Sequence, residues 1–191
     1  MRHLQSPERG KWKMIEERTG EAFEFDEQLT VVGGKLEPGD TAPEFELDYF
    51  DPINEEMGSV WLSDSVGSVR VLSVVNSLDT PVCQVETHRF EDSRSDLPSE
   101  VQLYTISMDL PFAQARWHQQ ENVSHRTLSS HRSEQFGRDY GVLLKEWRLL
   151  QRAVFVVDKN DQIVHAEYVD DQMTEPDYEA ALEAARKAAQ E

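Results

Sequence analysis

Residues 69–86, VRVLSVVNSLDTPVCQVE, join an apolar run to the only cysteine of the chain. The first part of this stretch, residues 69–77, is rich in β-branched side chains and lacks a polar face, which is typical of a strand buried on both sides of a sheet. Thr80 is a favourable N-cap and Pro81 suits the first helical position, so we expect a helix to begin there. Cys83 then lies in the first turn of that helix.

The segments around this stretch predict an α/β fold. A second buried strand is expected at residues 101–109, and the order strand, helix, strand implies a right-handed crossover with parallel pairing. Residues 21–34, EAFEFDEQLTVVGG, predict an early hairpin, and residues 152–169, RAVFVVDKNDQIVHAEYV, predict a late one. Helices are expected in three more segments, PFAQARWHQQ (111–120), SEQFGRDYGV (133–142) and TEPDYEAALEAARKAAQE (174–191).

Length and composition favour one folded domain. The chain has 191 residues, of which 38% are hydrophobic and 29% charged, so it has enough apolar surface for a core. We expect a polar arm at residues 1–20 and a domain at residues 21–191. A lone cysteine forms no internal disulfide and fits a reducing compartment. Because no segment has the pattern of a signal peptide or a membrane span, a cytoplasmic location is expected.

The charge of the chain limits its partners. The formal net charge is −18, from 37 acidic and 19 basic residues, so nucleic acid and anionic membranes are repelled at long range. We therefore expect neither as a partner. The acidic excess fits an adaptation to high salt and equally an ordinary acidic cytosolic protein, because composition alone fixes no habitat.

Cys83 has two interpretations on its residues alone. Unpaired N–H groups and the positive end of the helix dipole stabilise an anion in the first turn, which favours a reactive thiolate. An arginine about 4 Å away would add about 4 kcal/mol at an effective dielectric constant of about 20. The alternative is a small buried hydrophobe, the commonest state of a free cysteine. The strand, the threonine and the helix start together favour the reactive interpretation.

Several separate blocks of the sequence carry a resemblance to a known family. They occur in the expected order and spacing: SLDTPVC (77–83), SMDLPFAQARW (107–117), FGRDYGV (136–142), QRAVFVVD (151–158) and TEPDYEAAL (174–182). In these blocks the chain resembles the thiol peroxidase (Tpx-type) branch of the peroxiredoxins, from about residue 30 to 188. The resemblance implies a thioredoxin-like fold, with a central mixed β-sheet flanked by helices and an N-terminal β-hairpin, and a homodimer.

The resemblance also implies an active site. Cys83 is then the peroxidatic cysteine, Thr80 provides a hydroxyl that bonds the peroxide or the thiolate, and Arg152 holds the anion. Such enzymes reduce hydrogen peroxide and organic hydroperoxides. Donors fixed where charge develops, which here are Arg152, the Thr80 hydroxyl and the Cys83 N–H, would lower the barrier to attack by sulfur. No cofactor is expected, and the histidines lack metal-ligand spacing, so no metal is expected either.

Two positions depart from the family pattern. The family has a proline four residues before the threonine, where this chain has Asn76, which affects the loop geometry and the rate. The resolving cysteine of the family aligns with His118, so we expect a one-cysteine mechanism in which an external thiol, thioredoxin-like or small, recycles a Cys83 sulfenic acid. These departures also fit an alternative, a low-turnover redox sensor or partner-binding protein on the same fold. A disulfide reductase is disfavoured because no CxxC motif exists.

The remaining candidate residues have structural interpretations. Arg89 is expected to pair with Glu86 on the helix surface, and His118 to be an exposed helix histidine. Four apolar residues near the expected mouth of the site are interpreted mostly as core, although Trp147 could narrow or cover the pocket. They are Phe112, Trp117, Trp147 and Leu149.

Overall fold

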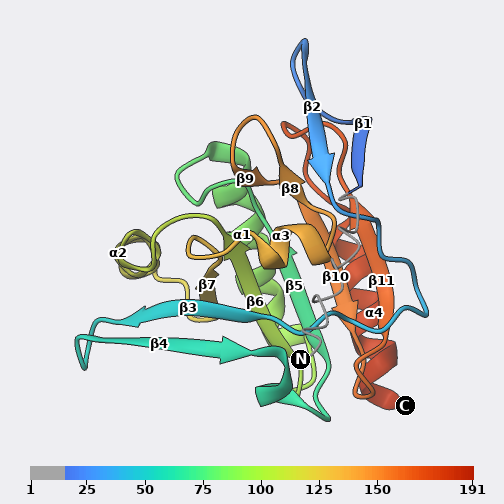
Figure 1. The fold of residues 1–191 in the computed structure, drawn as a ribbon. Coiled ribbons are helices and arrows are strands. Elements are labelled where there is room, and N and C mark those ends of the chain that lie inside the picture. The colour runs from blue at the N-terminus through green and yellow to red at the C-terminus, as the bar shows by residue number, and fades with distance from the viewer. Residues whose placement is uncertain (1–15) are drawn as a thin grey trace, which may run out of the picture.

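A computed structural model describes residues 16–191 as an α/β fold built on two sheets (Figure 1). The larger, seven-stranded sheet has the spatial order β11 (Ile163–Tyr168), β10 (Ala153–Val157), β5 (Arg70–Val74), β6 (Gln102–Ser107), β7 (Arg126–Ser129), β3 (Glu46–Asp51) and β4 (Glu56–Trp61). The smaller sheet has the order β1 (Glu17–Glu24), β2 (Glu27–Val32), β8 (Leu143–Leu144) and β9 (Leu149–Leu150).

Four α-helices accompany the sheets: α1 (Pro81–Ser93), α2 (Pro111–Glu121), α3 (Gln135–Asp139) and α4 (Tyr178–Gln190). Two short 3₁₀ helices are η1 (Leu62–Ser65) and η2 (Arg94–Asp96). The predicted thioredoxin-like fold is confirmed: the central sheet is mixed, helices flank it and the β1–β2 hairpin precedes it. In the described part of the chain, no helix is long and apolar enough to cross a membrane.

The central strand β5 forms as its sequence predicts. All five of its residues are buried, and it pairs parallel with β6 and antiparallel with β10. Successive side chains of β5 enter two different cores, because side chains alternate across a strand. Val71 packs with residues of α1 and α4, whereas Leu72 and Val74 pack with the loops and α3 on the other face.

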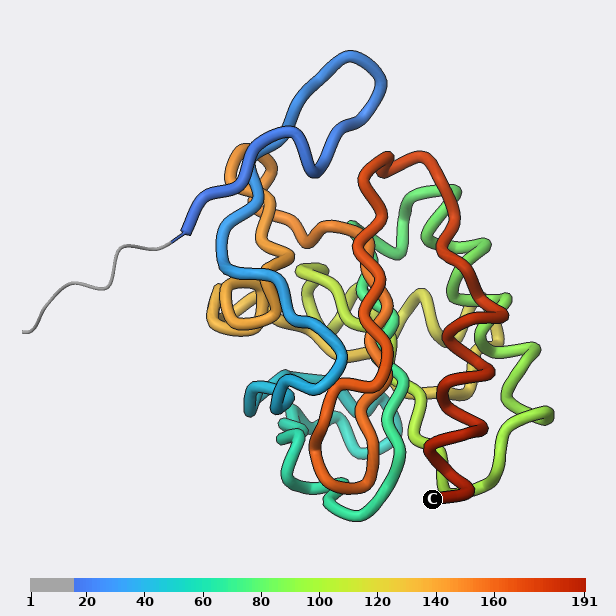
Figure 2. The backbone as a smooth tube through the Cα atoms, turned by 90° about the vertical axis from the view of Figure 1, so that its right-hand side faces the viewer, coloured from blue at the N-terminus to red at the C-terminus, as the bar shows by residue number. Residues whose placement is uncertain are grey.

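The helices α1 and α4 therefore cover one face of the sheet, and α3 lies over the other (Figure 2). On the α4 side, the predicted apolar stripe is buried at Ala181, Leu182 and Ala185. On the α3 side, Phe136 stacks on Tyr140 with ring centroids 4.5 Å apart. Both faces of β5 are thereby shielded from solvent. This packing holds in place the end of the strand, from which the chain continues to the cysteine.

The N-terminal hairpin lies beside the segment that follows β11. The N–H of Phe23 donates to the carbonyl of Asp170, and the N–H of Gln172 donates to the carbonyl of Phe23. Strand β1 begins at Glu17, and residues 1–15 of the predicted arm lie outside the described residues.

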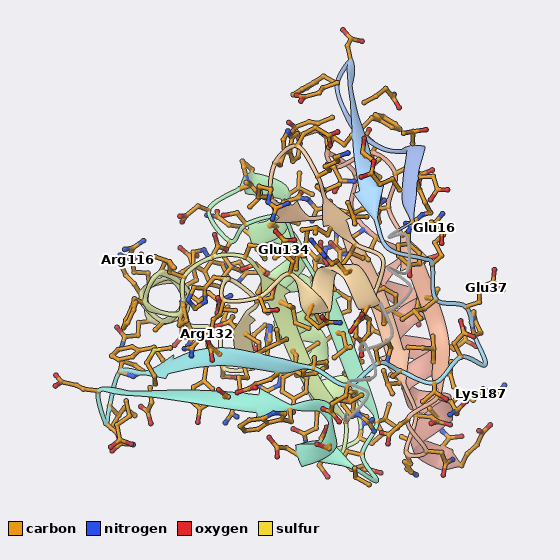
Figure 3. All side chains as sticks on the ribbon, in the orientation of Figure 1. Glu16, Glu37, Arg116, Arg132, Glu134 and Lys187 are labelled. Carbon is orange, nitrogen blue, oxygen red and sulfur yellow. The ribbon has the colours of Figure 1, made fainter. Side chains whose placement is uncertain are left out.

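Five exposed charged side chains lie at the periphery of the fold. Glu16, Glu37, Arg116, Arg132 and Lys187 are exposed and project from separate elements and loops (Figure 3). Because these charges face water, their pairwise interactions are weak and screened by salt.

Candidate active site

Cys83 is fully buried at the start of α1, in the first turn as predicted. The helix begins at Pro81, and Thr80 is its N-cap residue with an extended backbone. The first main-chain bond of the helix runs from the Gln84 N–H to the Thr80 carbonyl, over 3.0 Å. The N–H of Cys83 therefore precedes this ladder, among the unpaired donors that make a helix start attractive to an anion.

Thr80 does not cap the helix through its side chain. Its hydroxyl instead donates to the carbonyl of Ser77 over 2.9 Å, and its N–H donates to the same carbonyl over 3.1 Å. These two bonds close a tight turn before the helix. The turn uses the hydroxyl proton and leaves the lone pairs of the Thr80 oxygen available as acceptors.

Arg152 reaches Cys83 from the other side of the site. It immediately precedes β10 and is almost completely buried. Its Nη2 donates to the Cys83 Sγ over 3.4 Å and to the carbonyl of Gln172 over 3.0 Å. The fold thus places together the cysteine and the arginine that the sequence suggested, although 69 residues separate them along the chain.

Glu86 is a site residue that sequence reasoning missed. It is fully buried, forms an ion pair with the Arg152 Nη1 and accepts a hydrogen bond from the Ser73 hydroxyl over 2.7 Å. The predicted surface pair of Arg89 with Glu86 is therefore wrong, and Arg89 lies 4.0 Å from Glu175. The available signal was helical spacing, because residues three apart share one face and Glu86 follows Cys83 by three.

Two buried ionisable groups of opposite charge, Glu86 and Arg152, contact each other at this centre. Burial raises the pKa of Glu86 to about 7, against the attraction of Arg152 and the Ser73 hydrogen bond. Burial alone would lower the pKa of Arg152, but the charges of Glu86 and Cys83 raise it above its ordinary value. Arg152 is therefore held as a cation between a carboxyl group and a sulfur atom.

A cavity of about 400 Å³ adjoins this centre through Arg152, whereas the fully buried Cys83 lies behind its lining. Its polar lining includes Thr80, Arg152, Asn76 and Gln172. Apolar side chains form much of the remaining lining, which includes Phe25, Pro81, Val82, Trp147, Leu149 and Met173. The arrangement suits a small polar reacting group that carries an apolar substituent.

The four apolar residues predicted near the mouth have three different environments, and the interpretation that they are mostly core is wrong, because only Trp117 is buried. Trp147 and Leu149 line the cavity. Trp117 is buried in the cluster that contains Cys83, so it packs behind the sulfur. Phe112 is 56% exposed and packs its ring on Phe50, away from the cavity lining.

His118 occupies α2 at the place of the missing resolving cysteine. It is half-buried, which corrects the prediction of an exposed side chain, and its Nε2 lies 3.0 Å from the carbonyl oxygen of His125. It is absent from the residues that line the cavity beside Arg152. Within residues 16–191, no group of three or more histidine, cysteine, aspartate or glutamate side chains could hold a metal ion.

Comparison with known proteins gives a consistent result. The sequence profile described as the AhpC/TSA family matches residues 38–166. The chain is 43% identical over 161 residues to a thiol peroxidase of Halalkalibacterium halodurans, which covers 84% of this chain and 93% of the relative. It is 46% identical over 155 residues to a thiol peroxidase of Oceanobacillus iheyensis, covering 81% and 91%.

Among solved structures, a peroxiredoxin-like protein from Aquifex aeolicus superposes with a TM-score of 0.77 at 29% identity. The superposition covers 91% of this chain and 98% of that protein.

Proposed function

The chain belongs to the AhpC/TSA family, and on that premise we propose that Cys83 is the nucleophile of a thiol-dependent peroxidase, with Thr80 and Arg152 as its activating residues. The observation that carries the assignment is the contact of the Arg152 Nη2 with the Cys83 Sγ, 3.4 Å apart beside a cavity. Relatives that match more than four fifths of the chain are named thiol peroxidases. The substrates are hydrogen peroxide and organic hydroperoxides.

The reaction begins with the Cys83 thiolate. Its sulfur attacks one peroxide oxygen, an S–O bond forms and the O–O bond breaks. The leaving oxygen departs with the electron pair as hydroxide or alkoxide and takes up a proton, which gives water or an alcohol. Sulfur is oxidised by two electrons to a sulfenic acid. Arg152 and the Cys83 N–H lower the barrier by donating to the charge that moves between sulfur and oxygen.

Regeneration requires a thiol from outside the chain, because Cys83 is the only cysteine. A first external thiol condenses with the sulfenic acid, releasing water and forming a mixed disulfide. A second thiol attacks that disulfide and releases Cys83 as a thiol. The two electrons come from the two thiols, which leave as a disulfide, so a thioredoxin-like protein or a small thiol serves as the reductant.

The alternative of a low-turnover redox sensor is not favoured. Its motivation was Asn76 in place of proline and the absence of a second cysteine. Yet the cavity, the buried Arg152 and the thiol peroxidase relatives all fit turnover. A homodimer and a cytoplasmic location complete the proposal, supported by the resemblance and by the lone cysteine. The division of the chain at residue 20 stays a prediction, and β1 (Glu17–Glu24) runs across that boundary.

The experiment that tests the function follows oxidation of Cys83 directly. Reduced protein is mixed with stoichiometric peroxide in a stopped-flow instrument, and sulfenate formation is compared with that of free cysteine. We expect oxidation orders of magnitude faster than for free cysteine, no reaction in Cys83→Ser, and recovery of the thiol on adding a thioredoxin system or a small thiol. Oxidation near the rate of free cysteine, or a sulfenate that no thiol reduces, would contradict the proposal.

A further inference from the structure

We propose that Asn76 and Gln172 form a buried amide pair that positions Arg152 against Cys83. The inference rests on the proposed function, because it concerns how the same site is held in place. Neither residue is assigned contact with the reacting atoms, so both are positioning residues.

Gln172 holds Arg152 at both ends. Its side-chain Oε1 accepts the backbone N–H of Arg152 over 2.9 Å, and its own carbonyl accepts the Arg152 Nη2 over 3.0 Å. Its Nε2 donates to the carbonyl of Val169 over 2.7 Å, which anchors the segment after β11. One residue therefore binds both the backbone N–H of Arg152 and its guanidinium group, while the Arg152 carbonyl accepts the N–H of Val169 over 2.9 Å.

Asn76 extends this network to the loop that carries the cysteine. Its buried Nδ2 donates to the Gln172 Oε1 over 3.0 Å and to the carbonyl of Leu150 over 2.6 Å. Asn76 stands in the segment between β5 and α1, seven residues before Cys83. The amide pair therefore joins the cysteine loop to the chain just before Arg152.

The orientation of both amides follows from one donor. The backbone N–H of Arg152 can only donate, so the atom of Gln172 that faces it is the oxygen. That oxygen then requires the nitrogen of Asn76 to face it. A proline at position 76 would offer no side-chain donor. Asn76, which departs from the family pattern, therefore supplies the hydrogen bonds to Gln172 and to Leu150 that a proline could not.

The guanidinium group has few other supports. Among the described residues, its Nε is buried without a hydrogen-bond partner, and its Nη atoms contact Glu86, Cys83 and Gln172. Removing Gln172 Oε1 or its bond to Asn76 frees the main chain of Arg152 to shift. Because a charge interaction weakens with distance and a hydrogen bond needs alignment, the sulfur would lose stabilisation.

The test compares Asn76→Ala and Gln172→Met with Gln151→Met. The control removes an equally buried amide next to Arg152, whose Nε2 donates to the carbonyls of Glu21 and Val169. For each protein, the peroxide oxidation rate, the iodoacetamide alkylation rate and the urea midpoint are measured.

We expect both test variants to slow peroxide oxidation by about tenfold relative to the control. At a pH where every thiol is ionised, alkylation should stay within about twofold of wild type while peroxide oxidation stays slow, because only the peroxide step needs Arg152 in place. In the double variant, Asn76→Ala should add little to Gln172→Met, since its partner is already gone.

Test variants that match Gln151→Met in peroxide oxidation rate would overturn the proposal, and so would fully additive effects in the double variant. If Gln172→Met does not fold, Asn76→Ala decides alone, because it removes only the two hydrogen bonds of Asn76, to Gln172 and to Leu150. Slow oxidation of the wild-type protein would instead count against the proposed function, so the two failures are distinguishable.

Discussion

Two polar centres contain a carboxyl group of α1, Glu86 in the first and Glu91 in the second, and only the first contacts a reactive atom and adjoins a cavity. At the first, Arg152 contacts Cys83 beside the apolar cavity. At the second, the ring of His125 uses both nitrogens: Nδ1 lies 2.6 Å from the Glu91 Oε2, and Nε2 lies 2.8 Å from the Thr105 hydroxyl. A charged group inside the fold is therefore not in itself a sign of function. Where every polar atom of a cluster already has a hydrogen-bond partner, none is left to bind a substrate.

The two centres also differ in the pKa values of their carboxyl groups, Glu86 and Glu91. Burial raises the pKa of Glu86 to about 7. Burial would also raise the pKa of Glu91, but hydrogen bonds from Ser124 and from the backbone and ring of His125 lower it to about 2. Burial lowers the pKa of His125 to about 4. At neutral pH the second centre is thus a neutral ring bonded to a half-buried carboxylate whose hydrogen bonds come from the protein, which is a structural arrangement.

The largest expected effect comes from removing the cation of the first centre. Arg152→Met should slow peroxide oxidation by about 10²–10³, because the sulfur loses its charged donor. Arg152→Lys should recover little, since one ammonium group cannot reproduce a fork that contacts both Glu86 and Cys83. Stopped-flow oxidation rates measure this effect, and Arg132→Met, at an exposed arginine, is the control. A rate within about twofold of the control would remove the distinction between the two centres.

A smaller effect is expected from Glu86→Gln. The folded pKa of about 7 exceeds the ordinary value of 4.5, so between these pH values the native state keeps a proton that the unfolded state releases. This group therefore makes the wild-type free energy of unfolding fall as pH rises from about 4.5 to 7, and the variant should lack a contribution of about 1–3 kcal/mol.

Urea unfolding of wild type and Glu86→Gln is measured at several pH values. The difference between the two free energies of unfolding gives the pH-dependent contribution of Glu86. The amide still offers an oxygen to the Arg152 Nη1, so we expect peroxide oxidation to slow by only about tenfold or less. Parallel stability curves for the two proteins across this pH range would show that Glu86 is ionised throughout, as Glu91 is.

The sequence predicted more of the fold than of the site. The strand at residues 69–77 and the two hairpins were legible because their patterns are local and periodic. The family resemblance brought Cys83 and Arg152 to attention together. Glu86 was misassigned because its partner, Arg152, is 66 residues away in the sequence. Without tertiary contacts, a glutamate three positions before Arg89 is readily interpreted as its partner in a surface ion pair.

Gln172 escaped notice for a related reason. It follows an edge strand in a polar segment, DDQMTEP, where composition indicates a loop. Its burial comes from the hairpin β1–β2 and from Arg152, which lie far away in the sequence. Asn76 was singled out only as a departure from a motif, and its two hydrogen bonds depend on the same distant segment.

At the second centre, His125→Gln should change stability but not catalysis. Losing the paired ring should lower the free energy of unfolding by about 2 kcal/mol at neutral pH and leave peroxide oxidation within about twofold of wild type. The folded pKa of about 4 is below the ordinary 6.5, so the unfolded state binds a proton that the native state does not. Wild-type stability therefore falls as pH drops from about 6.5 to 4, and the variant should lose this dependence. A large loss of peroxide activity in a folded variant would show that this centre is catalytic.

The smallest effect is expected at His118, where the family places its resolving cysteine. The His118 Nε2 makes one hydrogen bond, to the carbonyl of His125, and the residue does not line the cavity beside Arg152. His118→Asn should therefore change the free energy of unfolding by about 1 kcal/mol or less and leave peroxide oxidation within about twofold of wild type. Measuring oxidation and thiol-dependent recycling separately makes the result informative. Normal oxidation with slow recycling would mean that the imidazole assists the external thiol, so that the place of the lost cysteine still serves the reductive half of the reaction.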